Sequence, residues 1–212
     1  MNKSDVDYTL YLCTDRHLMS CETIEESVEE GIKGGCSIVQ LREKDCSSRD
    51  FLELAKRVKS ITEKYNVPLI INDRVDIALL SNADGVHLGQ SDLPCSEVRK
   101  IVGENFIIGV SAATVSEAKK AQADGADYLG VGAMFPTSTK TNTRPVDKKT
   151  LKEIRSAVDI PFVIIGGIKK DNIGNFKDCG MNGAAVISAV VAQKDIEQAA
   201  KEMRKAIEET IR

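Results

Sequence analysis

The chain has 212 residues, and its 29 Lys and Arg against 32 Asp and Glu give a formal net charge of −3. This length is enough to bury the core of one larger domain, and we expect a single domain over residues 1–212. The acidic balance argues against nucleic acid or an anionic membrane as a partner, and no apolar run approaches the roughly 18 residues of a membrane span.

Short β-branched runs alternate with longer helical patterns along the chain. The eight strands that these runs predict cover residues 9–14, 37–41, 68–71, 84–88, 107–110, 127–131, 161–165 and 183–187. Eight strand–helix units in about 200 residues predict an α/β fold, a (β/α)8 TIM barrel at its compact limit. The alternative is a doubly wound open sheet, which would want a GxGxxG motif after its first strand, where this chain has Thr14, Asp15 and Arg16.

Helical periodicity is clearest in three of the connecting segments. Residues 48–62 carry one apolar stripe, Thr114–Glu117 is a capping-box pattern that opens a helix, and the final segment is amphipathic. The apolar positions concerned are Phe51, Leu54, Ala55, Val58 and Ile61; Ala118 and Ala121; and Ile196, Ala199, Ala200, Met203, Ile207 and Ile211.

The end of the second predicted strand carries three long polar side chains. Gln40, Arg42 and Lys44 lie at i, i+2 and i+4, so the period of two points them to one face. In a barrel of parallel strands, ligands bind at the carboxyl ends. Two cations and an amide there indicate a small anionic ligand, although an ordinary strand that runs into a solvated loop would read the same way.

Carboxylates follow the third and fourth strands. Asp73 comes after Asn72 at the end of one strand, and Asp92 follows the next strand in the motif Gly89-Gln90-Ser91-Asp92. Only two histidines exist, so any metal should be a hard cation held by oxygens, and we expect Mg²⁺ at these carboxylates. The alternatives are that Asp73 is a helix N-cap and Asp92 a turn residue.

The later loops offer groups that suit phosphate. From Thr137 to Arg144 no side chain is apolar, which is typical of a lid that closes over phosphate oxygens and equally of a plain solvated loop. The glycine pair Gly166-Gly167 and the segment after residue 187 lie after the seventh and eighth strands, where such barrels commonly bind phosphate. Ser111 ends the fifth strand and completes the ring.

Six cysteines are scattered without CxxC spacing, which favours reduced thiols and a cytoplasmic protein. The first residues, MNKSDVDYTLYL, lack the apolar region of a signal peptide. His17 follows the first strand and could reach the rim, but nothing around it indicates a poised base. We expect His87 to be a hydrogen-bonded core residue of the fourth strand.

The motifs QLREK, INDR, DGVHLGQSDLP, IGVSAATVSEA, VGAMFPTSTK, IGGI and AVIS occur in that order. From about Leu10 to about Val191 the chain resembles the thiamine-phosphate synthase (thiamine-phosphate pyrophosphorylase) family. The resemblance implies a (β/α)8 barrel that uses Mg²⁺ to join 4-amino-2-methyl-5-(diphosphooxymethyl)pyrimidine to a thiazole phosphate in thiamine biosynthesis, with release of pyrophosphate. The partners would be these small molecules, and a homo-oligomer is compatible with the sequence.

The resemblance also implies roles for residues that match the family motifs. Residues expected to hold the pyrimidine diphosphate are Gln40, Arg42, Lys44, Asn72, Ser111 and Lys140, and those expected to hold the thiazole phosphate are Thr137, Thr139, Gly167, Ile187 and Ser188. Glu43 and Ser138 are expected among the substrate-binding residues as well. Asp73 and Asp92 would hold Mg²⁺, and Lys140, Arg42 and Ser111 would be catalytic.

The chain departs from the family at two places. Ala113 stands where a histidine often follows the serine of the fifth strand, and the segment after Lys140 lacks a usual glycine. Two other functions share the barrel: a thiazole tautomerase-like isomerase, which would want a pocket histidine, and a non-catalytic phosphometabolite-binding protein, which would have lost Asp73, Asp92 or Lys140.

Overall fold

The computed structural model describes residues 3–136 and 144–212 and shows a closed barrel of eight parallel strands in the order β1 to β8. The strands are β1 (Leu10–Cys13), β2 (Ile38–Leu41), β3 (Leu69–Asn72), β4 (Gly85–Leu88), β5 (Ile107–Ala112), β6 (Tyr128–Gly132), β7 (Phe162–Ile165) and β8 (Gly183–Val186). Pairing of Tyr11 in β1 with Ala185 in β8 closes the ring. The predicted TIM barrel is therefore confirmed, and the open sheet is wrong.

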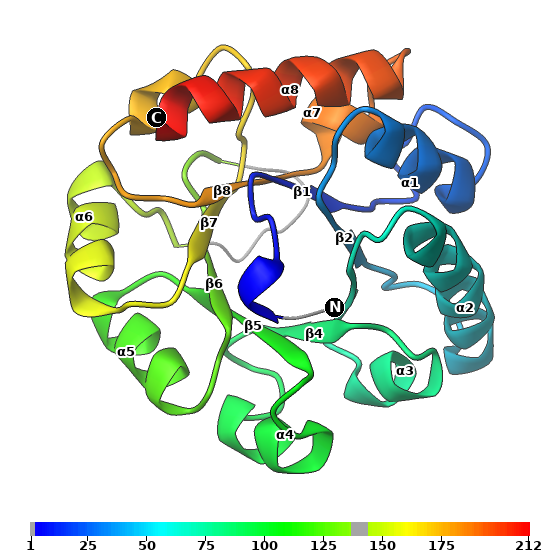
Figure 1. The fold of residues 1–212 in the computed structure, drawn as a ribbon, viewed down its shortest axis with the longest axis horizontal. Coiled ribbons are helices and arrows are strands. Elements are labelled where there is room, and N and C mark those ends of the chain that lie inside the picture. The colour runs from blue at the N-terminus through cyan, green and yellow to red at the C-terminus, as the bar shows by residue number, and fades with distance from the viewer. Residues whose placement is uncertain (1–2, 137–143) are drawn as a thin grey trace.

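Helices surround the barrel in a single outer layer (Figure 1). They are α1 (Ile24–Lys33), α2 (Ser48–Lys64), α3 (Val75–Leu80), α4 (Cys95–Val102), α5 (Val115–Ala123), α6 (Lys148–Ala157), α7 (Ser188–Val191) and α8 (Ile196–Ile211), with 3₁₀ turns η1 (Lys3–Asp5) and η2 (Ile173–Phe176). The connection between β7 and β8 carries η2 in place of a full α-helix. Among the described residues we find no helix with both the length and the hydrophobicity of a membrane span.

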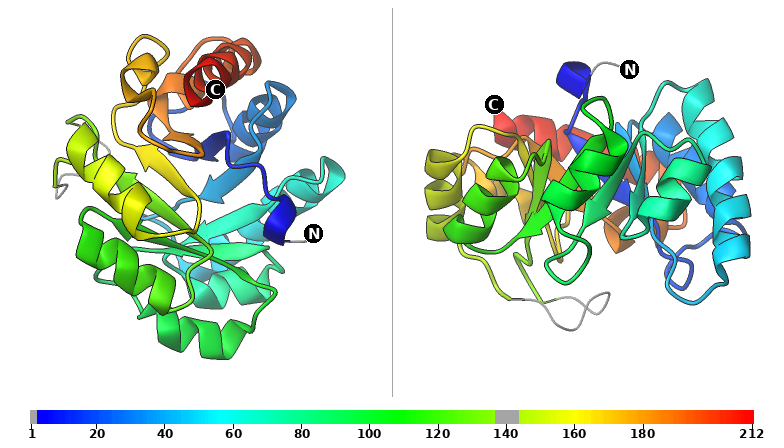
Figure 2. Two further views of the ribbon diagram at one scale, coloured as in Figure 1. Left: turned by 60° about the vertical axis from the view of Figure 1, so that its left-hand side comes forward. Right: turned by 90° about the horizontal axis from the view of Figure 1, so that it is seen from below.

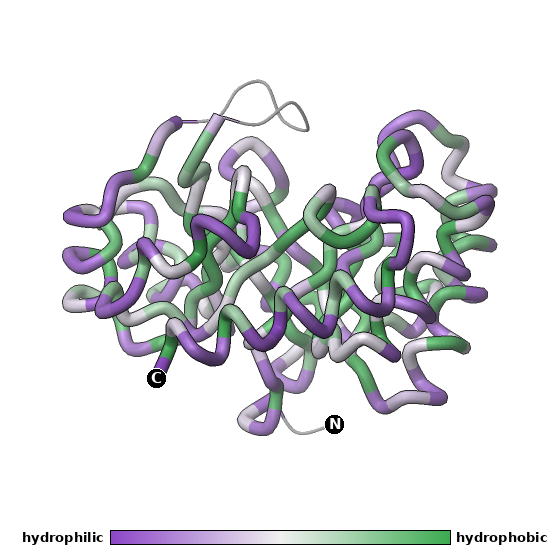
Figure 3. Tube along the Cα trace, turned by 90° about the horizontal axis from the view of Figure 1, so that it is seen from above, coloured by the Kyte–Doolittle hydropathy of each residue, from purple (hydrophilic) through white to green (hydrophobic). Residues whose placement is uncertain are grey.

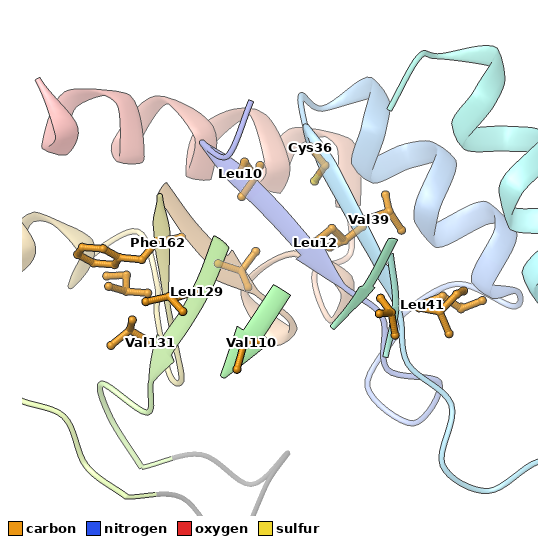
Figure 4. Packing of buried hydrophobic residues seen from close by; sticks show 14 of the residues in the cluster. Leu10, Leu12, Cys36, Val39, Leu41, Val110, Leu129, Val131 and Phe162 are labelled. Carbon is orange, nitrogen blue, oxygen red and sulfur yellow. The ribbon is translucent and has the colours of Figure 1, made fainter. Parts of the chain in front are cut away.

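Alternation along each strand builds two separate cores. Leu10 and Leu12 face outward and pack with Val39, Leu41 and Phe162 beneath the helices (Figure 4). The positions between them face inward, where Tyr11 and Tyr128 lie with aliphatic side chains such as Ile38 and Ile70. Strands buried on both faces are nearly continuous apolar runs, which is why they could be recognised in the sequence.

The helices are amphipathic as expected, and hydrophobic and hydrophilic residues alternate along them (Figure 3). In α2 the predicted stripe is buried except for Ile61, which is partly covered. In α5 the Thr114 side chain caps the helix by accepting from the Glu117 N–H, and Ala118 and Ala121 are buried. Ile211, the last residue of α8, is exposed.

The N-terminal segment covers the end of the barrel at which the strands begin (Figure 2). Lys3 pairs with Asp127, directly before β6, at 2.7 Å between Nζ and Oδ1. Asp7 pairs with Arg204 of α8 at 2.8 Å. One end of the barrel is thus covered by the chain itself, and the opposite end, where the strands finish, is left for a ligand.

Candidate functional site

A cavity of about 730 Å³ opens at the carboxyl ends of the strands. Its wall contains seven of the predicted site residues: Gln40, Arg42, Asn72, Ser111, Gly167, Ile187 and Ser188. They come from five strands and the loops that follow, so the barrel brings together residues almost 150 positions apart in sequence. This is the location at which ligands bind in TIM barrels.

The end of β2 supplies the amide and the guanidinium of this wall. Gln40 is buried, and its Nε2 donates to the Tyr11 hydroxyl at 2.8 Å. The backbone N–H of Arg42 donates to the Thr14 hydroxyl at 3.0 Å, and its guanidinium lies 3.6 Å from Asp15. Of the three residues predicted to share one face, Gln40 and Arg42 line the cavity and Lys44 does not, so the prediction is confirmed for two of them and wrong for Lys44.

Lys44 reaches a neighbouring group and does not line the cavity wall. Its Nζ lies 2.5 Å from the Asp73 carboxylate. Asp73 adopts a positive φ of 63°, and its carboxylate meets Lys44 from the segment after β2. Arg74, rather than Asp73, is the N-cap of α3 and makes no side-chain cap there, so the N-cap interpretation of Asp73 is wrong.

The carboxyl groups of Asp73 and Asp92 lie close enough for each to affect the pKa of the other. Burial acts to raise the pKa of Asp73, but the hydrogen bond with Lys44 and the interaction with Asp92 outweigh it, and the pKa is lowered. Burial and the neighbouring Asp73 raise the pKa of Asp92, although the Gly89 N–H donates to it at 2.6 Å. Asp92 therefore also closes a turn, as the alternative interpretation held.

These two carboxylates are the groups that could hold a metal ion. Within residues 3–136 and 144–212, no cluster of three or more His, Cys, Asp or Glu side chains could do so. Mg²⁺ commonly takes one or two carboxylates and completes its shell with water and substrate phosphates. A pair of adjacent carboxylates, with the pKa of one raised by the other, has the donor set and the excess negative charge for such an ion.

The glycine pair after β7 adopts the backbone that only glycine takes readily, with φ of 100° at Gly166 and 64° at Gly167. A Cβ on Gly167 would lie 2.8 Å from that of Phe135. The Asn172 side chain donates to the Gly167 carbonyl at 2.9 Å and holds the loop against the cavity. Lys169, in the same loop, also lines the cavity and adds a cation that we did not predict.

Further groups in the cavity wall were not predicted as site residues. Arg144 and Glu117 line it and form an ion pair of 2.5 Å, and Gln90 donates to the Ser111 carbonyl at 2.6 Å. His87 is a hydrogen-bonded core residue, as expected, but it also reaches the cavity together with Tyr11. For His87 and Tyr11, the sequence indicated only that they lie in buried strands. A buried strand residue can face either the packed interior of the barrel or the cavity, so the sequence did not identify them as site residues.

Some predicted residues lie elsewhere. Glu43 is turned away from the cavity: its side chain is 4% exposed and pairs with Arg16 at 3.0 Å. Thr137, Ser138, Thr139 and Lys140 lie outside the described residues, and so does the rest of the predicted lid except Arg144. Ala113, at the position where the family often has histidine, lines the cavity.

Known proteins similar to this chain agree in name. The family model described as thiamine monophosphate synthase matches residues 10–190. Thiamine-phosphate synthase of Clostridium beijerinckii is 56% identical over 202 residues, covering 95% of this chain and 97% of that protein. The protein of the same name from Ruminiclostridium cellulolyticum is 58% identical over 201 residues, covering 95% and 96%.

Solved structures with the same fold include one of the same family and one with a different name. Thiamine phosphate pyrophosphorylase from Pyrococcus furiosus matches with a TM-score of 0.90 at 40% identity, covering 98% of both chains. A 3-hexulose-6-phosphate synthase matches with a TM-score of 0.67 at 17% identity, covering 93% of this chain and 99% of that one, and shares the fold alone.

Proposed function

The chain belongs to the thiamine monophosphate synthase family, and we propose that it catalyses the family reaction in thiamine biosynthesis. In that reaction 4-amino-2-methyl-5-(diphosphooxymethyl)pyrimidine and a thiazole phosphate give thiamine phosphate and pyrophosphate. The observation that carries the proposal is the mouth of the barrel, where Arg42 lines the cavity and Lys44 lies 2.5 Å from Asp73 of the carboxylate pair.

The chemistry requires stabilisation of a leaving group. The bond between the pyrimidine methylene and the diphosphate oxygen breaks, its electron pair leaves with pyrophosphate, and the thiazole nitrogen forms a new bond to the methylene carbon. Negative charge therefore grows on pyrophosphate, and preorganised cations such as Arg42 and Lys44 suit that need. Mg²⁺, when bound at Asp73 and Asp92, would supply further charge neutralisation for the same group.

The second substrate needs its own phosphate site. Gly167, Ile187 and Ser188 line the cavity, and Lys169 adds a positive charge nearby. Backbone N–H groups in glycine-rich loops can approach an anion closely. We propose that these residues, together with Thr137 and Thr139 of the segment between β6 and α6, bind the thiazole phosphate. Lys140 of the same segment would bind the pyrimidine diphosphate, and Ser138 would be a further substrate contact.

No cavity residue needs to act as a covalent nucleophile. Cys13 is the thiol of the described cavity wall, and burial raises its pKa to about 12, which keeps it protonated at neutral pH. Ser111 is hydrogen-bonded to His87, but in a Ser-His-Asp triad a carboxylate holds the second ring nitrogen, and here that nitrogen faces the Tyr128 hydroxyl. Direct attack by the thiazole nitrogen fits this inventory.

A substrate-omission assay tests the proposal. Pyrophosphate should appear only when both substrates and Mg²⁺ are present, and it should stay at background when either substrate is omitted. An isomerase would convert one thiazole compound without releasing pyrophosphate, and a binding protein would release none under any condition. Pyrophosphate from the pyrimidine diphosphate alone would indicate hydrolysis and would contradict the proposal.

A further inference from the structure

Tyr128 lies behind the cavity wall and does not line it. We propose that Tyr128 is a positioning residue: through its hydroxyl it fixes the tautomer of His87, and this leaves the hydroxyl hydrogen of Ser111 for the substrate. The kinetic part of this inference rests on the proposed function. The tautomer does not depend on it.

Five side chains from five strands form a continuous chain of hydrogen bonds across the barrel. Gln40 Nε2 donates to Tyr11 Oη at 2.8 Å, and Tyr11 Oη lies 2.7 Å from Tyr128 Oη. Tyr128 Oη lies 3.0 Å from His87 Nδ1, and His87 Nε2 lies 3.0 Å from Ser111 Oγ. Both ends of the chain, Gln40 and Ser111, line the cavity.

The Gln40 amide sets the direction of every bond in this chain. Each phenol carries one hydrogen, because burial raises the pKa of Tyr11 and Tyr128 well above the ordinary value. Tyr11 Oη accepts from Gln40 and lies 2.7 Å from Tyr128 Oη, so in the proposed arrangement the Tyr11 hydrogen goes to Tyr128 and the Tyr128 hydrogen goes to His87 Nδ1. The opposite direction would leave the Tyr11 hydrogen without an acceptor in this series of bonds.

An imidazole whose Nδ1 accepts must carry its hydrogen on Nε2 when it is neutral. Nε2–H of His87 then donates to Ser111 Oγ, and the Ser111 hydroxyl hydrogen remains for another acceptor. In the reversed chain, Tyr11 would donate to the Gln40 oxygen and Ser111 would donate to His87. Ser111 would then have no hydrogen to donate to a substrate oxygen. The direction of these hydrogen bonds therefore decides whether Ser111 offers the substrate a donor or only an acceptor.

The barrel makes room for this arrangement at two glycines. A Cβ on Gly109 would lie 2.1 Å from the Tyr128 ring, and a Cβ on Gly130 would lie 2.9 Å from the His87 ring. Neither glycine has a positive φ, so space rather than backbone conformation requires them. The two rings also contact each other, with centroids 5.5 Å apart, and Tyr128 is fully buried. These contacts hold the hydroxyl and the imidazole in register.

The tautomer can be measured directly, because the chain has only two histidines. In His17→Gln protein labelled with ¹⁵N, the remaining imidazole belongs to His87. Long-range ¹H–¹⁵N spectra at neutral pH should show a protonated Nε2 and an unprotonated Nδ1. In Tyr128→Phe the Nδ1 partner is lost, and a mixture of tautomers should appear. A protonated Nδ1 of His87 in the protein that keeps Tyr128 would overturn the inference, whether or not the protein is active.

Kinetics test whether the effect reaches the substrate. Tyr128→Phe should lower kcat/KM about tenfold, mainly through kcat, because one oriented hydrogen bond is lost. Tyr8→Phe is the matched control. Tyr8 packs on the Tyr128 ring at 5.2 Å, and its hydroxyl makes no hydrogen bond to the described residues, so its activity should not change.

A double-mutant cycle separates positioning from a structural effect. In a Ser111→Ala background, Tyr128→Phe should cost less than about twofold, since the hydrogen that it positions is already absent. If Tyr128→Phe lowered kcat/KM by the same factor with Ser111 present and with Ser111→Ala, the inference would be overturned. If the unsubstituted protein formed no pyrophosphate from both substrates, the proposed function would fail, and the spectra would still decide the tautomer.

Discussion

Asp92 accepts a hydrogen bond from the Gly89 N–H within a turn, and it lies near the carboxylate of Asp73. Asp92→Asn keeps the side-chain oxygen that the Gly89 N–H needs but removes the negative charge. We expect turnover to fall by more than about tenfold, equal to about 1.4 kcal/mol of transition-state stabilisation, with little loss of folding stability. Initial rates over a range of Mg²⁺ concentrations, together with thermal unfolding, measure both effects.

Asp76→Asn in α3 is the control for that variant, since Asp76 is an exposed carboxylate paired with Arg74. It should leave the rate and the Mg²⁺ dependence unchanged. An Asp92→Asn enzyme that keeps most of its rate at every Mg²⁺ concentration would show that the carboxylate pair holds no catalytic metal.

Ala113 tests how much the departure from the family pattern matters. The charge that develops belongs to pyrophosphate, and Ala113 lines the cavity without carrying a group that could meet it. Ala113→His should change the rate by about tenfold or less at neutral pH, because it adds at most one hydrogen bond worth roughly 0.5–1.5 kcal/mol. A gain of several orders of magnitude in the pyrophosphate assay would mean that the unsubstituted chain is an impaired enzyme.

Residue patterns predicted part of the site and missed another part. The period of two placed Gln40 and Arg42 on one face, and both line the cavity. The same period places Glu43 on the opposite face of the strand, although its position in the QLREK motif led us to expect a substrate contact. In the structure Glu43 pairs with Arg16 instead. Local spacing was the better guide there, because side-chain direction follows the backbone and not the motif.

At the scale of elements, the N-terminal end of α5 lies at the cavity, because Glu117 in its first turn lines the cavity wall. Thr114 caps the helix, and Glu117 accepts from the Ala113 N–H at 2.8 Å while it pairs with Arg144 in the cavity wall. Thr114→Ala should destabilise the protein by about 1 kcal/mol, because the Glu117 N–H loses its acceptor. Denaturant unfolding measures this loss, and Thr114→Ser, which keeps the hydroxyl, should restore most of it. Equal stability of all three proteins would contradict the capping role.

The strands themselves could be predicted to within two residues at each end. Parallel strands buried on both faces leave an unmistakable apolar run, and the residues after each run fall at the mouth by topology alone. The connection between β7 and β8 was less readable, since its η2 turn spans only Ile173–Phe176 and has no helical stripe.

At the scale of the whole molecule, the N-terminal segment connects the two ends of the chain. Burial acts to raise the pKa of Asp7, but hydrogen bonds from Thr9 and the contact with Arg204 outweigh it, and the pKa is lowered. A lowered pKa means that the ionised form stabilises the fold above the ordinary value of 3.8, and this contribution is lost as the pH falls through the folded value.

Asp7→Asn should therefore be less stable than the unsubstituted chain at neutral pH, by about 1 kcal/mol or less, because the pair is partly screened by solvent. The difference should vanish below the lowered pKa. Unfolding midpoints between pH 7 and pH 2 measure it. A difference that stays constant over this range would show that the Asp7 charge has no part in holding the segment.

Barrel closure explains why the chain of hydrogen bonds could not be predicted. Tyr11 and Tyr128 are 117 positions apart, and each by itself is an ordinary aromatic residue in an apolar strand. Their hydroxyls meet because β1 and β6 face each other across the barrel, a relation set by strand number and tilt together. No local pattern carries that information.

The central claim is that this barrel mouth joins two phosphorylated substrates. Quantifying products after a timed reaction with both substrates and Mg²⁺ tests it most directly. We predict one thiamine phosphate for each pyrophosphate, and loss of both products together in Arg42→Ala. Pyrophosphate formed without an equal amount of thiamine phosphate, or equal product yields from Arg42→Ala and the unsubstituted enzyme, would contradict the account.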